Sequence, residues 1–121
     1  MKKTVSILFF GIAVAVVAGI TPLKWKSTTV ELGEVSVNES RDLSFEFTNT
    51  SSQSITILEA KGSCGCTNVQ YPEQKIKPGE TASISANFKS GKTGAFKKNI
   101  RIKTSESEEY TYLYFTGEVV E

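Results

Sequence analysis

LSFEFT, residues Leu43–Thr48, indicates the fold most clearly, because three large apolar residues alternate in it with three polar ones. A period of two places successive side chains on opposite faces of an extended strand. The same alternation recurs in Ala82–Phe88, Phe96–Ile102 and Leu113–Val119. Such a strand packs one face on a core and turns the other to water, so several of them need a second sheet to cover them. The sequence therefore predicts an all-β sandwich.

Turn residues separate these segments and set the number of strands. Pro78-Gly79 suits the centre of a type II turn, since proline fixes φ and glycine accepts a positive φ. Seven short strands at this spacing are typical of an immunoglobulin-like sandwich. We expect them at 29–35, 41–49, 54–61, 66–71, 80–89, 95–104 and 109–119.

The N-terminus carries the pattern of an export signal. Lys2 and Lys3 precede 20 uncharged residues, Thr4–Leu23, and a basic start followed by an apolar run is typical of a signal peptide. The run is also long enough for a spanning helix, and Trp25 between two lysines resembles an interfacial anchor. We expect an N-terminal apolar helix in residues 1–23, as a cleaved signal peptide or a retained membrane anchor.

A linker at 24–28 and a sandwich domain at 29–121 complete the predicted organisation. Both fates of the N-terminal segment lead to an exported domain. If the segment is retained, the domain is anchored on the periplasmic side of the cytoplasmic membrane through residues 4–23. If it is cleaved, the domain is periplasmic or secreted.

Composition argues against several function classes. Without Lys2 and Lys3, 12 of the 14 basic residues remain against 13 acidic ones, so there is no basic excess of the kind that nucleic-acid binding needs. The chain has no histidine, the residue that nucleophilic and general acid–base catalysis most often recruits. We expect no enzyme activity and no cofactor.

Cys64-Gly65-Cys66 is the chemically most distinctive motif and contains both cysteines of the chain. Cα atoms two residues apart in a strand lie near the upper limit for a disulfide, and Gly65 would let the backbone bend to close the gap. Four interpretations stay open: a packed or passively bridged structural pair, a redox or thiol-exchange site, a weak Cu(I) site on the two thiolates, and an intermolecular bridge.

A second candidate lies near the C-terminus. Tyr112 and Tyr114 alternate with apolar residues, so they share one sheet face, which is either an ordinary half-covered surface or an aromatic contact surface. A run of six basic residues with no acidic residue within it precedes these tyrosines in the chain: Lys89, Lys92, Lys97, Lys98, Arg101 and Lys103. Lys98 interrupts the apolar side of its strand, which is typical of a sheet edge or rim. The basic run suggests charge pairing with Glu106, Glu108 and Glu109 in a hairpin, or an acidic partner.

Four blocks of sequence, taken together, resemble a bacterial family named domain of unknown function 1573. The resemblance covers about residues 29–121, and its most specific block is Ser63–Thr67. The other blocks are Phe45–Thr50, Ile76–Glu80, and Phe88 and Ser90 followed by Gly94 and Phe96. The resemblance implies an exported immunoglobulin-like domain, related in shape to cilia-associated and sperm-protein-like modules, and implies no known activity.

These observations predict an exported, non-enzymatic binding or scaffold module. Its candidate binding surface is Tyr112 and Tyr114, and its expected partner is another envelope protein or a glycan. The alternative is a thiol-redox or Cu(I)-handling protein that uses Cys64 and Cys66, with Gly65 between them.

Overall fold

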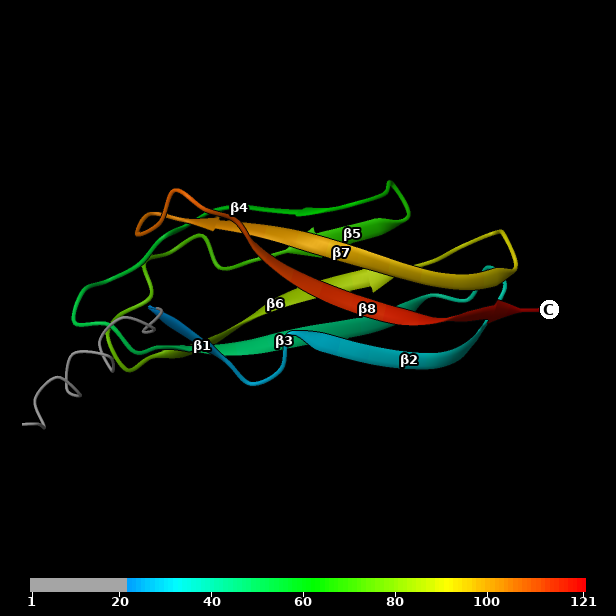
Figure 1. Ribbon diagram of the computed structural model, residues 1–121, viewed down its shortest axis with the longest axis horizontal. Coiled ribbons are helices and arrows are strands. Elements are labelled where there is room, and N and C mark those ends of the chain that lie inside the picture. The colour runs from blue at the N-terminus through cyan, green and yellow to red at the C-terminus, as the bar shows by residue number, and fades with distance from the viewer. Residues whose placement is uncertain (1–21) are drawn as a thin grey trace, which may run out of the picture.

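The computed structural model describes residues 22–121, which form two four-stranded sheets packed face to face (Figure 1). One sheet has the strand order β1-β3-β6-β5 and the other β2-β8-β7-β4. The strands, in chain order, are β1 (Leu23–Trp25), β2 (Thr29–Ser36), β3 (Arg41–Asn49), β4 (Ile57–Gly62), β5 (Thr67–Gln70), β6 (Thr81–Phe88), β7 (Gly94–Thr104) and β8 (Thr111–Val120).

The core is built from the apolar side of each alternating segment. In β3, Leu43, Phe45 and Phe47 are buried, and Ser44 and Glu46 between them are exposed. Full burial of one such side chain contributes about 1.5–3 kcal/mol, so the two inner faces provide the main driving force for folding. The core also contains Ile55, Ile57, Ile76, Ile84, Phe88, Ile100, Ile102, Leu113 and Phe115.

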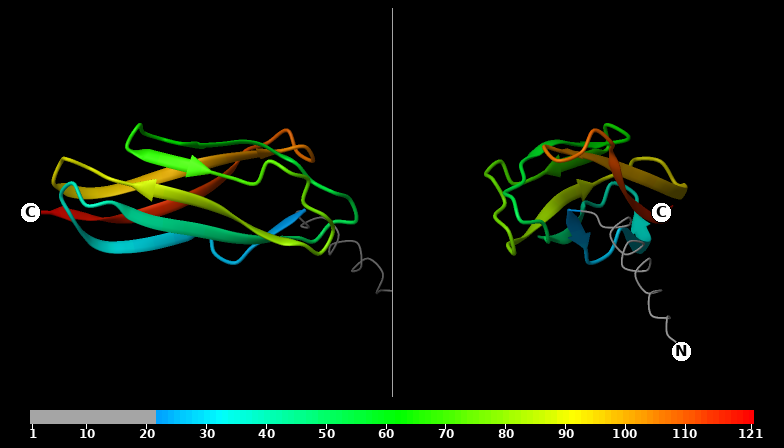
Figure 2. Two further views of the ribbon diagram at one scale, coloured as in Figure 1. Left: turned by 180° about the vertical axis from the view of Figure 1, so that it is seen from behind. Right: turned by 60° about the vertical axis from the view of Figure 1, so that its left-hand side comes forward.

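Within residues 22–121 the chain passes from one sheet to the other at five of its seven connections. β1 pairs antiparallel with β3, whereas β2 runs parallel to β8 in the opposite sheet. Ser63–Cys66 likewise carries the chain from β4, which pairs with β7, to β5, which pairs with β6. Figure 2 shows β4 and β5 along one side of the sandwich, in different sheets. The β4–β5 connection therefore places the cysteines at an edge where the two sheets meet.

The structure confirms the predicted all-β sandwich, with eight strands in place of seven. The seven expected segments correspond to β2–β8: the bounds of β3 agree with the expected 41–49, and the other strands differ by one to three residues at an end. Residues 54–56 precede β4 because Ile55 instead forms an isolated bridge with Ile76. The additional strand is β1, whose first residue lies in the predicted apolar segment and whose other two lie in the predicted linker.

Trp25 is therefore part of the sandwich. Its ring lies 4.9 Å from that of Phe47, centroid to centroid, and Leu23 is buried. The assignment of residues 24–28 to a linker is wrong at its first two residues. β1 was not predicted because a three-residue strand is too short to establish a period.

The predicted N-terminal helix falls on residues 1–21, outside the described part. Among residues 22–121, no helix is long and apolar enough to cross a membrane.

Candidate functional site

Cys64 and Cys66 form a disulfide in the connection between β4 and β5, with their Cα atoms 5.3 Å apart. The backbone is held at both ends of the bridge. Ser63 N donates to the carbonyl of Asn99 at 2.9 Å, and Lys89 N donates to the carbonyl of Cys66 at 3.2 Å. Gly65 is exposed, and a Cβ placed on it would meet no atom within 4 Å. The bridge is thus anchored at its ends and open at its tip.

An open hollow of about 490 Å³ lies beside the bridge. We call it the lysine hollow. Cys66 lines it, together with the β6–β7 connection and the start of β7. β4 pairs with β7 only as far as Ile100, so the segment before Ile100 has β8 alone as a neighbour in the sheet. This part of β7 is an edge, as Lys98 suggested. The lysines of the hollow are Lys89, Lys92 and Lys98.

The outer surface of β7 and β8 presents aromatic rings beside cations, and we call it the tyrosine face. Tyr112 is 45% exposed and Tyr110 39%, while Tyr114 is half-buried. The Arg101 guanidinium lies 5.3 Å from the centroid of the Tyr110 ring. The face comprises Tyr110, Tyr112, Tyr114, Lys97, Arg101 and Lys103.

One carboxylate organises the centre of this face. Glu59 on β4 accepts a hydrogen bond from Arg101 Nε at 2.8 Å and one from the Tyr110 hydroxyl at 3.1 Å. The Arg101 bond, with that of Tyr110 second, holds the pKa of Glu59 below its ordinary 4.5. The same carboxylate raises the pKa of Tyr110, because the hydrogen bond favours the protonated phenol. The network fixes the Tyr110 ring beside Arg101.

The basic run does not form a single patch. Because side chains alternate along β7, Lys97, Arg101 and Lys103 lie on the tyrosine face, whereas Lys98 lines the lysine hollow. The anticipated pairing with the glutamates of the β7–β8 connection takes a different form. Arg101 forms its ion pair with Glu59, and Lys103 donates to the backbone carbonyl of Glu108 at 2.9 Å.

The disulfide loop and the tyrosine face are neighbours. Asn99 N donates to Ser63 Oγ at 3.1 Å, and Asn99 lies directly across from Tyr114 in the β7–β8 register. The two candidates that the sequence suggested separately therefore border each other through one cross-strand row. In the bridged form neither cysteine sulfur is a thiolate. Binding of Cu(I) by Cys64 and Cys66 would therefore require that the disulfide be reduced first. Among the described residues, no group of three potential metal ligands occurs.

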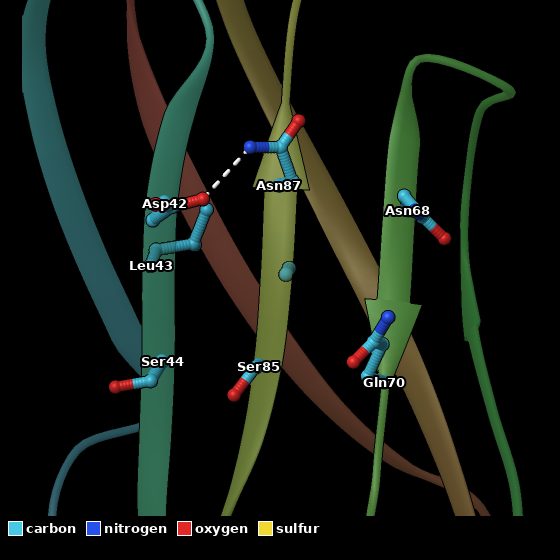
Figure 3. A pocket seen from close by; sticks show the side chains of 8 residues that line it. Asp42, Leu43, Ser44, Asn68, Gln70, Ser85 and Asn87 are labelled. Carbon is cyan, nitrogen blue, oxygen red and sulfur yellow. Dashed lines mark hydrogen bonds between the residues drawn. The ribbon is translucent and has the colours of Figure 1, made fainter.

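A third surface, which we call the polar hollow, was not anticipated from the sequence. It has a volume of about 480 Å³ and lies on the outer face of β3, β6 and β5 (Figure 3). Its side chains form two cross-strand rows: Asp42, Asn87 and Asn68, then Ser44, Ser85 and Gln70. Asn87 Nδ2 donates to Asp42 Oδ1 at 2.7 Å. Exposed polar residues in a strand give no local signal of such convergence, because the rows exist only once the strands are paired.

Solved structures with the same fold support the architecture. A protein of unknown function from Porphyromonas gingivalis W83 matches with a TM-score of 0.67 and 12% identity, over 84% of this chain and 50% of that one. The chain thus spans half the length of that protein. PapD-like domain 7 of human CEP192 matches with a TM-score of 0.65 and 9% identity, over 84% and 87% of the two chains.

WR4, a member of the MSP family from C. elegans, matches with a TM-score of 0.57 and 10% identity, over 84% of this chain and all of that one. At such identities the likeness concerns the fold alone. No curated protein matches the sequence. A family model does match, over residues 23–119, which begins at β1 and ends within β8. The chain belongs to the family described as protein of unknown function DUF1573.

Proposed function

We propose that the chain is a non-enzymatic binding module, presented outside the cytoplasmic membrane, which docks an acidic protein surface on its tyrosine face. The observation that carries the proposal is the packing of exposed Tyr110 and Tyr112 beside Arg101 and Lys103 on the broad side of a sheet. Tyrosine and arginine are among the residues most enriched at the centres of protein interfaces. Here they are already ordered before a partner arrives.

Charge selects the class of partner. The tyrosine face carries three cations, and the carboxylate at its centre, Glu59, is engaged by Arg101 and Tyr110. A partner rich in aspartate and glutamate would meet a complementary potential, which accelerates encounter and disfavours basic competitors. The neighbours with PapD-like and MSP-like folds are consistent with a binding or scaffold role at the level of architecture.

A photo-crosslinking amino acid placed at position 112 in cells that express the full chain tests the proposal. We expect a discrete protein adduct from position 112 and none from position 85, which lies in the polar hollow. Combining the crosslinker with Arg101→Glu and Lys103→Glu should lower the adduct yield at least about tenfold, because like charges then face the acidic partner. Lys75→Glu with Lys77→Glu, two exposed lysines outside the tyrosine face, is the matched control.

Three results would overturn the proposal: an adduct from position 85 alone, an adduct that survives the Arg101 and Lys103 reversals, or no adduct from position 112. A protein adduct from position 85 alone would place the partner on the polar hollow instead. A glycan-sized adduct there would favour the glycan alternative, because the amides and hydroxyls of the hollow offer the donors and acceptors that a glycan needs.

A second candidate function, thiol–disulfide exchange, rests on the location of the disulfide. The bridge closes a ring between residues only two apart, so it constrains the unfolded chain little as a structural staple. It lies at an exposed edge beside an open hollow, where a thiol from solution can reach it. The double variant Cys64→Ser, Cys66→Ser separates the two functions, since a binding module keeps its crosslinked partner and an exchange protein loses its reaction with thiols.

A further inference from the structure

The two sulfurs of the bridge have different surroundings, and this difference assigns their roles in exchange. Cys66 lines the lysine hollow and contacts the hydrophobic core. Cys64 does not line the hollow, and its Sγ lies 3.6 Å from Thr67 Oγ1. A nucleophile that enters through the hollow therefore meets Cys66 first, and the Thr67 hydroxyl is positioned to donate to a thiolate on Cys64.

The charge of the hollow selects the thiol. Lys89, Lys92 and Lys98 line it, and no carboxylate occurs among the lining residues that the structure describes. Nearby ammonium groups stabilise a thiolate and attract a compound with further negative charge. A volume of about 490 Å³ lies within the range of small-molecule sites. We propose that the lysine hollow admits a low-molecular-weight anionic thiol, which attacks the disulfide at Cys66. The proposal rests on the second candidate function above.

The reaction balances without a further reagent. The thiolate RS⁻ forms a new bond to Cys66 Sγ as the Cys64–Cys66 bond breaks, and the electron pair passes to Cys64 Sγ, which becomes a thiolate beside Thr67. A second RS⁻ then attacks the RS sulfur of the mixed disulfide and releases RSSR and the Cys66 thiolate. Two thiols are thus oxidised by two electrons in total, and the protein takes up those electrons, with protons from solvent, as its dithiol.

The test compares two probe thiols of similar size and opposite charge, 2-mercaptoethanesulfonate and cysteamine, on the full chain. Rates are expressed per thiolate, and the intermediate is trapped with iodoacetamide and mapped by peptide mass spectrometry. We expect the mixed disulfide on Cys66 and the alkyl group on Cys64. At low ionic strength the anionic thiol should react about tenfold faster, and the difference should shrink in 0.5 M salt, as about a 4 Å Debye length implies.

Variants distinguish a charged entry from general reactivity. Lys89→Gln with Lys92→Gln should remove most of the preference for the anionic thiol and leave the cysteamine rate nearly unchanged. Lys75→Gln with Lys77→Gln, on the β5–β6 connection away from the hollow, should preserve the preference. Thr67→Val should slow attack by both thiols, because it removes the donor to Cys64.

The possible failures can be told apart. If neither thiol reacts with the bridge, the second candidate function itself is overturned. If both react but the adduct maps to Cys64, or the rates are equal and independent of salt, exchange stands and the entry through the lysine hollow is overturned. The tyrosine face is not altered by any of these variants, so neither result bears on the binding proposal.

Discussion

The side chain of Asn49 donates a hydrogen bond from Nδ2 to the carbonyl of Ile76 at 2.8 Å, and both residues are buried. Nδ2 also donates to the carbonyl of Gln53, while Oδ1 accepts from the backbone N–H and the hydroxyl of Ser51. One amide thus uses its full hydrogen-bonding capacity to join the end of β3 to the loop that follows and to the segment before β6.

Replacing Asn49 should cost more stability than any polar substitution on the surface. In Asn49→Ala, the buried carbonyl of Ile76 loses its side-chain donor and the β3–β4 loop loses its organiser, so we expect a loss of about 2–4 kcal/mol in the free energy of unfolding. Urea denaturation followed by circular dichroism measures it. Asn68→Ala, on the exposed face of β5, is the control and should stay within about 0.5 kcal/mol. Equal losses in the two variants would contradict the assignment.

Gly117 marks a close approach between β8, β2 and β7. A Cβ at this position would lie 2.7 Å from the carbonyl oxygen of Gly33 and 2.7 Å from Cζ of Phe96. Gly33 lies in the irregularity of the β2–β8 ladder between Glu31 and Glu34 and has φ of 70°, so it cannot easily give way. We expect Gly117→Ala to destabilise the domain by about 1–3 kcal/mol.

Gly65→Ala is the matched comparison, because its added Cβ meets nothing within 4 Å. Thermal unfolding of the two alanine variants side by side should show a clear decrease in melting temperature for Gly117→Ala and little change for Gly65→Ala. A decrease for Gly65→Ala that matched or exceeded that of Gly117→Ala would show that backbone conformation, and not the lack of space, governs these positions.

The Glu59 carboxylate should titrate below its ordinary pKa of 4.5, because it accepts from Arg101 and Tyr110. A lowered pKa in the folded state means that the contribution of Glu59 to stability is present above pH 4.5 and is lost as pH falls through the folded-state pKa. Carbon-detected NMR titration measures the midpoint. Arg101→Gln should raise it more than Tyr110→Phe does. A wild-type midpoint at or above 4.5 would refute the network.

Trp25 is the single tryptophan of the chain and reports on β1. Its ring packs against Phe47, so its fluorescence emission should shift to longer wavelength when urea unfolds the sandwich. Trp25→Ala should lower the free energy of unfolding by about 1–3 kcal/mol, since a half-buried ring loses less than the 3–5 kcal/mol of a fully buried one. Emission that is insensitive to urea would mean that β1 is not docked in solution.

Much of the sandwich is predictable because a long strand with one buried face has an alternating pattern of apolar and polar residues in its own sequence. The alternation in β3, β6, β7 and β8 identifies the buried residues of each strand without reference to the others. β1 has no such pattern, because Leu23–Trp25 is only three residues long. It also directly follows an apolar segment, so its first residue cannot be distinguished from that segment in the sequence. The cysteines and the tyrosines stand out from the sequence as candidates, but their adjacency through Ser63 and Asn99 does not.

The side of each long strand that faces the core can be read from local sequence, because a period of two is a property of neighbouring residues. The two cysteines at Cys64 and Cys66 also stand out in the sequence as a candidate site, with several interpretations open. The neighbours of each candidate residue, in contrast, depend on how the strands pair and pack in the folded chain. Asp42 and Asn68 share one row of the polar hollow because both pair with Asn87, and Cys66 meets the lysines of the β6–β7 connection because the chain changes sheet after Gly62. Such contacts depend on strand register between segments far apart in the chain, which no local pattern specifies.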